Sequence, residues 1–242
     1  MQMTVKENCR LTAAVWQLVL EGSTADIRRP GQFVQLKLPG FYLRRPISVC
    51  DWDADTLTLV YKVVGAGTEA MTTYAPGMAL DVLSGLGNGF DTSACGTHPL
   101  LIGGGVGLPP MTGLCRELIA ECKQPTVLAG FGTAGEVFLR DRIEAIGAQM
   151  ILTTMDGSAG IRGVVTDALS TVSYDSVCAC GPMPMLKAVC AAIPESIPVQ
   201  VSLEERMGCG FGACMGCTIQ TKSGNRRVCA DGPVFRREEV LW

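Results

Sequence analysis

The sequence predicts an antiparallel β-barrel followed by an α/β domain with a parallel sheet, and a small cysteine-rich segment at the C-terminus. Three observations support this fold class. Alternating apolar and polar runs, separated by glycine and proline, reach from Cys9 to about Asp91. Short apolar strands then alternate with helical stretches. Four of the twelve cysteines lie between Met207 and Pro233.

The barrel is expected over residues 1–95. Residues 32–38 and 57–63 alternate apolar and polar side chains, which is typical of strands with one buried face. The small, polar stretch 92–99 precedes a continuous apolar strand, so we place the domain boundary there. With 242 residues and 48% hydrophobic content, the chain is long enough to bury two modest cores.

The α/β domain is expected over residues 96–199. Apolar strands at 126–129, 150–153 and 176–179 alternate with helices at 110–122 and 183–192, the pattern of a parallel sheet. Its first strand runs into a glycine-rich turn that lets a pyrophosphate approach the backbone at a helix N-terminus. A purely structural turn is an equal alternative, because the spacing is not GxGxxG. The candidate nucleotide residues are Gly103, Gly104, Gly105 and Gly107.

The charge after the second strand bears on the choice of nucleotide. Residues 130–136 contain no cation and one carboxylate, Glu136. Binding NADP requires Arg or Lys at the 2′-phosphate, so we predict NAD. Arg140 and Arg142 follow closely and are the cations that could fold back to this site.

A third motif lies in the barrel, at residues 44–48, 60–62 and 65–68. An arginine and a hydroxyl on one extended strand can reach the same phosphate and ribitol groups, and a glycine with a threonine offers donors at a loop. A lone charge on a strand is usually a surface charge, but here the motif occurs together with the glycine-rich turn and the cysteine cluster. The candidate residues are Arg45, Pro46, Ile47, Ser48, Val60, Tyr61, Lys62, Gly67 and Thr68.

The C-terminal segment, residues 200–242, contains the cysteine pattern Cys209-x4-Cys214-x2-Cys217, with Cys229 after eleven more residues. The first three positions match the plant-type ferredoxin pattern for a [2Fe–2S] cluster. Structural zinc sites also use four cysteines, but they usually come as two CxxC pairs. A strand, turn and returning strand over 218–228 would bring the fourth cysteine back to the loop. Small residues fill the loop and permit positive φ and close backbone approach, namely Gly210, Gly212, Ala213 and Gly216.

These motifs together resemble a known family. The order RRPIS, YKVVGAGT, GLGNGF, IGGGVGLPP, CGPM and SLEERMGCGFGAC is similar to ferredoxin reductase-like flavoproteins, and within them to the electron-transfer subunits of NAD-dependent (class 1B) dihydroorotate dehydrogenase. The resemblance runs from about Arg10 to the C-terminus. It implies that the barrel motif holds FAD, that the α/β domain binds NAD, and that Cys209, Cys214, Cys217 and Cys229 ligate the cluster.

Two further residues are interpreted through this resemblance. Many of these reductases carry an aromatic residue where Ile47 stands, so stacking on the flavin would come from elsewhere or be weaker. Such reductases also bring a cysteine near the nicotinamide, and Cys180 follows a buried strand at the corresponding place. A buried thiol at a strand end is an equal alternative for Cys180.

The resemblance implies an oxidoreductase subunit of pyrimidine (UMP) biosynthesis that moves electrons between a partner's FMN and NAD. A nicotinamide transfers a hydride and a [2Fe–2S] cluster moves single electrons, so FAD would link them. Dihydroorotate would bind the FMN-containing catalytic partner, in a heterotetramer of two copies of each chain. The alternative is a subunit of another NAD(P)H-linked flavin and iron–sulfur oxidoreductase, of sulfide or ferredoxin:NADP type. That family has aspartate at one cluster cysteine, so Cys209 favours the first interpretation. A zinc-stabilised nucleotide-binding module is the non-enzymatic alternative.

Composition argues against other classes. A net charge of −3 and a pI near 5.3 disfavour nucleic acid as a partner. The first 22 residues mix charged and polar side chains into their apolar run, which predicts neither a signal peptide nor a membrane span. Many cysteines without an export signal favour metal or redox chemistry in the cytoplasm over a disulfide scaffold.

Overall fold

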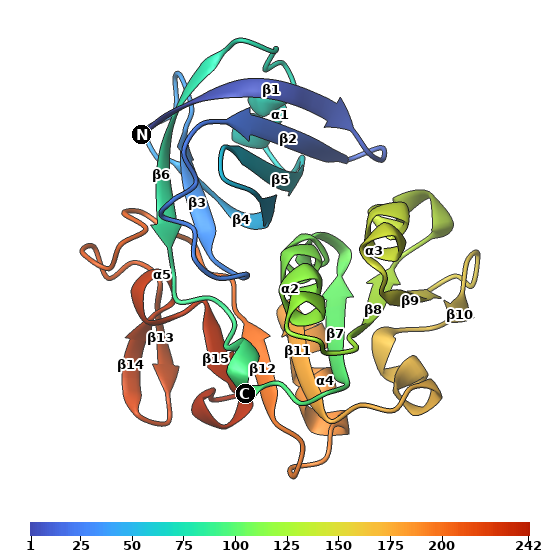
Figure 1. The fold of residues 1–242 in the computed structure, drawn as a ribbon. Helices are drawn as coiled ribbons and strands as arrows, with labels where there is room; N and C mark the ends of the chain where they lie inside the picture. The colour runs from blue at the N-terminus through green and yellow to red at the C-terminus, as the bar shows by residue number, and fades with distance from the viewer.

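A computed structural model describes residues 1–242. The first domain is a closed antiparallel barrel with the strand order β1-β2-β5-β4-β3-β6, at the top of Figure 1. Its core holds inward-facing side chains such as Leu18, Leu36 and Leu59, so the period-two alternation of the sequence produces one buried face per strand. The elements are β1 (Gln2–Arg10), β2 (Val15–Glu21), β3 (Phe33–Lys37), β4 (Arg45–Trp52), β5 (Thr56–Lys62), α1 (Ala66–Met71) and β6 (Ala79–Leu86).

The second domain is built on a seven-stranded sheet with the order β10-β9-β8-β7-β11-β12-β15. All neighbours are parallel except the last pair, β12 and β15. The central strands have nearly continuous apolar sequences because helices cover the sheet. The strands of the sheet are β7 (Pro99–Gly104), β8 (Thr126–Phe131), β9 (Gln149–Thr154), β10 (Ile161–Arg162), β11 (Ser176–Cys180), β12 (Val199–Ser202) and β15 (Val234–Arg236).

The helices of this domain are α2 (Pro109–Ala120), α3 (Arg140–Ile146) and α4 (Met183–Ala192). Helix α2 lies between the barrel and the sheet, where it contacts β4 on one side and β7 on the other (Figure 1). None of the helices is long and apolar enough to span a bilayer. Short 3₁₀ turns complete the connections, namely η1 (Thr92–Ala94), η2 (Gly105–Gly107), η3 (Ala134–Glu136), η4 (Val165–Thr171) and η5 (Arg237–Glu239).

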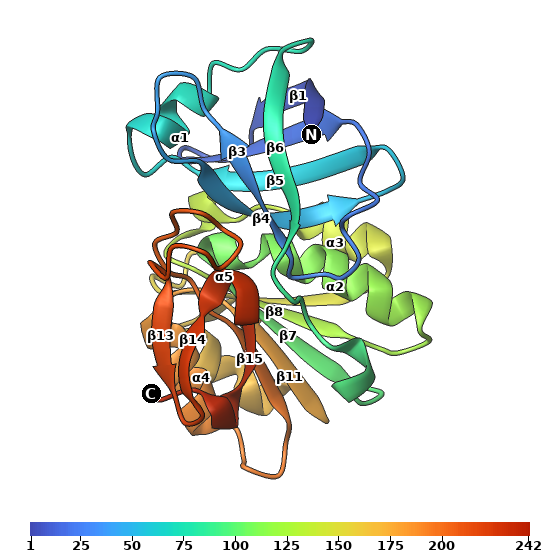
Figure 2. The same cartoon turned by 90° about the vertical axis from the view of Figure 1, so that its left-hand side faces the viewer.

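The C-terminal segment leaves the sheet after β12 and returns to it. The hairpin of β13 (Thr218–Thr221) and β14 (Gly224–Arg227) leads into α5 (Val228–Asp231), and β15 (Val234–Arg236) then pairs antiparallel to β12. Figure 2 shows this segment beside the sheet and below the barrel. Its side chains share one hydrophobic core with the sheet and with Phe33 of the barrel.

The structure confirms the fold class and the elements predicted from periodicity. The predicted strands at 126–129, 150–153 and 176–179 correspond to β8, β9 and β11, and the predicted helices correspond to α2 and α4. The hairpin after the third cluster cysteine also forms, with its turn at Lys222–Ser223. The domain boundaries stay a prediction. Strand β12 runs across the expected boundary at 199/200, and β15 joins the C-terminal segment to the sheet.

Candidate functional site

The four cysteines of the C-terminal segment come together as two pairs. The N–H of Cys209 donates to Sγ of Cys214 at 3.5 Å and the N–H of Cys214 donates to Sγ of Cys209 at 3.4 Å, while the N–H of Cys229 donates to Sγ of Cys217 at 3.4 Å. No three His, Cys, Asp or Glu side chains converge as ligands of a single ion. A [2Fe–2S] cluster has four thiolate ligands on two irons, so a pair of pairs fits such a cluster.

Backbone N–H groups of the loop point at the sulfurs. The Sγ of Cys209 accepts from the N–H of Ala213 at 3.2 Å and of Cys214 at 3.4 Å. The Sγ of Cys217 accepts from the N–H of Cys229 at 3.4 Å. These amides are the donors that a bound cluster needs, because hydrogen bonds to its sulfurs tune its properties.

The loop conformation depends on positive φ at three residues. Gly210 has φ +82° and Gly212 has φ +88°, as the sequence predicted. Gly216 does not adopt positive φ; Met215 does, with φ +60°. The side chain of Arg227 holds the loop to α5, because its Nη1 donates to the Gly212 carbonyl at 2.9 Å while its Nε lies 3.1 Å from Asp231.

The two thiols at the ends of the motif differ in acidity. Burial opposes ionisation of Cys209, but the backbone N–H groups around its sulfur prevail and lower its pKa to about 6. Burial, together with the neighbouring Cys217 thiol, raises the pKa of Cys229 to about 12. The loop N–H groups therefore favour the thiolate form of Cys209, whereas burial opposes the thiolate form of Cys229, which a bound cation would favour.

A cavity of about 340 Å³ lies where the barrel, the sheet and the C-terminal segment meet. Eight of the nine residues predicted to hold FAD line it, and the ninth, Gly67, lies against the guanidinium of Arg45. Phe33, Val106, Glu205, Met207 and Pro233 also border it. The eight predicted residues are Arg45, Pro46, Ile47, Ser48, Val60, Tyr61, Lys62 and Thr68.

The side chains of this set differ in what they offer to a ligand. The ring of Tyr61 belongs to the barrel core, where its hydroxyl donates to Asn8 at 3.2 Å and burial raises its pKa to about 12. The hydroxyl of Thr68 accepts from the Val64 N–H at 2.9 Å and so shapes the turn before α1. Arg45 and Lys62 are the cations of the cavity. Their charge suits the phosphates of a flavin nucleotide.

A second cavity, of about 320 Å³, continues from the first. Lys62, Val106 and Glu204 border both. The far side of the second cavity is formed by Gly104, Gly105 and Gly107, by the hairpin residues 12–15 and by the residues after β11. The flavin-type cavity and the glycine-rich turn thus meet at one junction, where a hydride donor and acceptor can be brought together.

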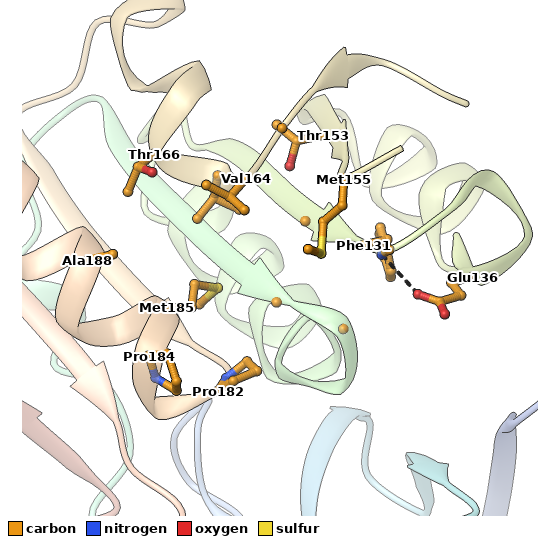
Figure 3. Close-up of a pocket in the computed structure, with 16 residues that line it drawn as sticks. Phe131, Glu136, Thr153, Met155, Val164, Thr166, Pro182, Pro184, Met185 and Ala188 are labelled. Carbon is orange, nitrogen blue, oxygen red and sulfur yellow. Dashed lines mark hydrogen bonds between the residues drawn. The ribbon is translucent and has the colours of Figure 1, made fainter. Parts of the chain in front are cut away.

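A third cavity, of about 380 Å³, continues along the carboxyl ends of the parallel strands. Such a position at the end of an open α/β sheet is where nucleotides bind. Figure 3 shows Met155, Val164 and Phe131 around it, with the Glu136 carboxylate accepting from the Gly132 N–H at 2.9 Å. Its lining contains no Lys or Arg.

The two arginines that could have supplied a cation are used elsewhere. Arg140 pairs with Glu144 at 2.9 Å on the surface of α3. Arg142 pairs with Asp51 of the barrel at 2.8 Å. Neither residue lines the third cavity.

Besides Gly67, two of the residues predicted around the flavin and the nicotinamide nucleotide line none of the three cavities. Gly103 lies behind the turn, where an added Cβ would be 2.7 Å from the Cα of Leu108. Cys180 is 2% exposed, and burial raises its pKa to about 12. The next two residues along the chain, Gly181 and Pro182, do border the second cavity.

Sequence reasoning missed residues that reach the cavities from outside the motifs. Glu204 borders two cavities, and Phe33 and Met207 line the first. The sequence feature that could have identified Glu204 is its position just before the cysteine loop. Phe33 and Met207 read as ordinary apolar residues, so nothing in their local sequence marks them.

Comparisons with known proteins agree with this geometry. A model of the iron–sulfur cluster binding domain of dihydroorotate dehydrogenase B matches residues 204–241. The dihydroorotate dehydrogenase B (NAD(+)) electron transfer subunit of Geobacillus sp. (strain WCH70) is 40% identical, over 99% of this chain and 98% of its own length. The subunit of the same name from Listeria monocytogenes serotype 4a (strain HCC23) is 41% identical over the same shares of the two chains.

Solved structures show the same architecture. A chain of an NADH-dependent reduced ferredoxin-NADP oxidoreductase is 30% identical, with a TM-score of 0.89 over 99% of this chain and 90% of its own. A ferredoxin NADP+ reductase from Neisseria gonorrhoeae with bound FAD and NADP has a TM-score of 0.67 over 79% of this chain and 89% of its own; at 16% identity it shows the fold alone. The chain therefore belongs to the family of dihydroorotate dehydrogenase B (NAD(+)) electron transfer subunits.

Proposed function

We propose that this chain passes electrons between NAD and the FMN of a dihydroorotate dehydrogenase catalytic subunit, through FAD and a [2Fe–2S] cluster of its own. The observation that carries the proposal is the junction of three parts around one cavity. Val106 of the glycine-rich turn and Met207 of the cysteine segment border the cavity that Arg45 and Lys62 line. Residues of this cavity would hold FAD, which would supply two-electron exchange with a nicotinamide and one-electron exchange with a cluster.

The chain's own residues serve three tasks. The cysteines 209, 214, 217 and 229 hold the cluster, and the loop amides stabilise its sulfurs. Arg45 and Lys62 bind the phosphates and position the flavin. Gly104, Gly105 and Gly107 admit NAD against the backbone, so that the nicotinamide reaches the junction beside Glu204. Cys180 is buried at this end of β11, where burial raises its pKa to about 12 and keeps its thiol neutral.

The cysteine loop supplies the exit for electrons. Cys214 is exposed, and so are Phe211 (61%) and Met215 (53%) on either side of it. Exposed apolar side chains beside a redox centre suit a protein partner. We infer that the FMN subunit docks here, in an assembly of two copies of each chain, and that dihydroorotate binds the partner. We also infer that the complex serves pyrimidine synthesis in the cytoplasm, where the cysteines outside the cluster motif stay reduced.

The test is to tag the chain in its native host, recover the complex under anaerobic conditions and assay dihydroorotate-dependent reduction of NAD. We expect activity in the wild type and in Cys122→Ser, which alters an exposed cysteine outside the segment. Cys214→Ser should abolish that activity while NADH still reduces the flavin. A complex in which NADH bleaches the flavin but dihydroorotate does nothing would overturn the partner and the pathway.

A second candidate is a subunit of a ferredoxin-linked NADPH oxidoreductase. It is favoured by the TM-score of 0.89 to such a protein, but the identity of 30% is below the 40% to the dihydroorotate dehydrogenase B subunit from Geobacillus. The same complex distinguishes the two candidates. Reduction of NADP by reduced ferredoxin together with NADH, without any response to dihydroorotate, would support the second.

A further inference from the structure

Gln35 is a fully buried glutamine that has no hydrogen-bond partner for its side chain. It lies on β3 with 0% exposure, and neither its Nε2 nor its Oε1 has a partner within the protein. The other unpartnered buried side-chain atoms are single hydroxyls, of Tyr74, Ser84 and Thr112. Leaving an amide unpaired in the interior costs about 1–3 kcal/mol. Because an unpaired buried amide lowers stability, we infer that the Gln35 side chain forms hydrogen bonds with a group that the folded protein binds.

The amide lies flat against the cysteine loop. A Cβ added to Gly210 would be 2.6 Å from Cδ of Gln35, 2.7 Å from Nε2 and 2.8 Å from Oε1. Because these three distances are nearly equal, the plane of the amide faces the Cα of Gly210. Only glycine permits this approach, and Gly210 is the residue directly after Cys209.

The surroundings of Gln35 offer it nothing else. On the barrel side its neighbours are Pro46 of β4, which has no N–H, and Leu83 of β6. Phe33, two residues earlier on the same face of β3, packs in one core with Cys217 and Cys229 and also lines the flavin cavity. This face of β3 therefore lies between the two cofactor sites, and Gln35 is its buried polar residue.

We propose that Gln35 donates a side-chain N–H to a sulfur of the iron–sulfur cluster and thereby raises the cluster's reduction potential. The inference rests on the proposed cluster site at the four cysteines. A carboxamide supplies two N–H donors, and the sulfurs of an iron–sulfur cluster accept hydrogen bonds. A hydrogen bond to sulfur stabilises the more negative, reduced cluster, so the potential rises. Gln35 is thus a positioning and tuning residue between flavin and cluster.

The experiment is an EPR-monitored redox titration of the purified holo-complex, which reports the cluster without any turnover. Gln35→Met keeps the length of the side chain and removes the donor. We expect this variant to lower the midpoint potential of the cluster. At a fixed solution potential, the ratio of reduced to oxidised cluster should fall about tenfold, which corresponds to a shift of about 59 mV for a one-electron couple. Gln35→Glu places a carboxyl group at the same site; burial keeps it protonated and able to donate, so it should lower the potential less than Gln35→Met does. Thr112→Val, which removes an unpartnered buried hydroxyl from α2, is the matched control and should leave the potential unchanged.

A second measurement needs no variant. In protein with ¹⁵N-labelled glutamine side chains, pulsed EPR of the reduced cluster should show a coupling from an amide nitrogen. Absence of that coupling in the wild type, or an unchanged cluster potential in Gln35→Met and Gln35→Glu, would overturn the inference. A shift confined to the flavin potential would also overturn it, by assigning the amide to the flavin. Absence of any [2Fe–2S] signal in the wild type would instead refute the proposed cluster site.

Discussion

Arg142 of the α/β domain and Asp51 of the barrel form an ion pair across the domain interface, with Nη2 2.8 Å from Oδ2. The second oxygen of Asp51 lies 2.8 Å from Nη1 of Arg116, which stacks over Trp52 at 5.0 Å. Asp51 is 13% exposed, while each arginine is about one-third exposed. One carboxylate on β4 therefore binds arginines of both α2 and α3.

Asp51→Asn should loosen this interface. The substitution leaves two guanidinium groups facing an uncharged amide. We expect the free energy of unfolding to fall by about 1–3 kcal/mol, which lies between the losses typical of exposed and of buried salt bridges. Because the cavities meet at the interface, reduction of the flavin by NADH should slow as well. Thermal unfolding and stopped-flow flavin reduction measure the two effects. Asp141→Asn, on the exposed surface of α3, is the control; equal behaviour of both variants would refute the role of Asp51.

The glycine-rich turn has a packing requirement that is separate from nucleotide binding. A Cβ on Gly107 would collide with the carbonyl oxygen of Cys180, so Gly107→Ala should push β11 away from the turn and cost about 1–3 kcal/mol. Gly135→Ala alters another residue that borders the second cavity, where the nearest atom, Oγ1 of Thr133, lies 3.8 Å from the added Cβ. It should leave the unfolding temperature unchanged. Calorimetry of the two variants without NAD checks the contrast.

The third cavity predicts a preference for NADH that a single cation should weaken. Met155 is 65% exposed at the rim of this cavity, which has no Lys or Arg in its lining (Figure 3). Met155→Arg places a guanidinium where a 2′-phosphate can meet it, and a charged hydrogen bond of this kind is worth about tenfold in binding. We expect KM for NADPH to fall by about that factor. Met155→Gln is the uncharged control, and an equal response to both variants would place the 2′-phosphate elsewhere.

Glu204 predicts a pH dependence. Desolvation raises the pKa of its carboxyl above the ordinary value of 4.5, although much of the side chain stays open to solvent. A raised carboxyl pKa means that the folded state binds the proton more tightly than the unfolded state. The favourable contribution is therefore complete below pH 4.5 and is lost as pH rises through the raised pKa.

Glu204→Gln removes this titration. As pH rises through the raised pKa of Glu204, we expect the variant to become more stable relative to the wild type. The gain should be modest, because solvent screens the exposed part of the Glu204 side chain. Chemical denaturation at a series of pH values measures it, with Glu205→Gln as the neighbouring control. Parallel pH profiles for the wild type and Glu204→Gln would show that Glu204 is not desolvated.

The sequence alone determined the features that depend on neighbours along the chain. The alternation in 32–38 and 57–63 specified barrel strands, the glycines after β7 specified the turn, and the cysteine spacing specified the two-pair loop. Each rests on a short-range rule, because side-chain period, backbone freedom and ligand spacing act within a few residues. Eight of the nine predicted flavin residues accordingly line one cavity.

The tertiary structure decided what covers each outward-facing residue. Gln35 reads as a polar position on a half-exposed strand, yet Gly210 of the cysteine loop, far along the chain, buries it completely. Glu204 and Val106 border the same two cavities although they come from different segments. Arg142 turned to the barrel instead of the nucleotide cavity. A local pattern cannot specify such placements, because they arise when separate elements pack together and exclude water from the surfaces between them.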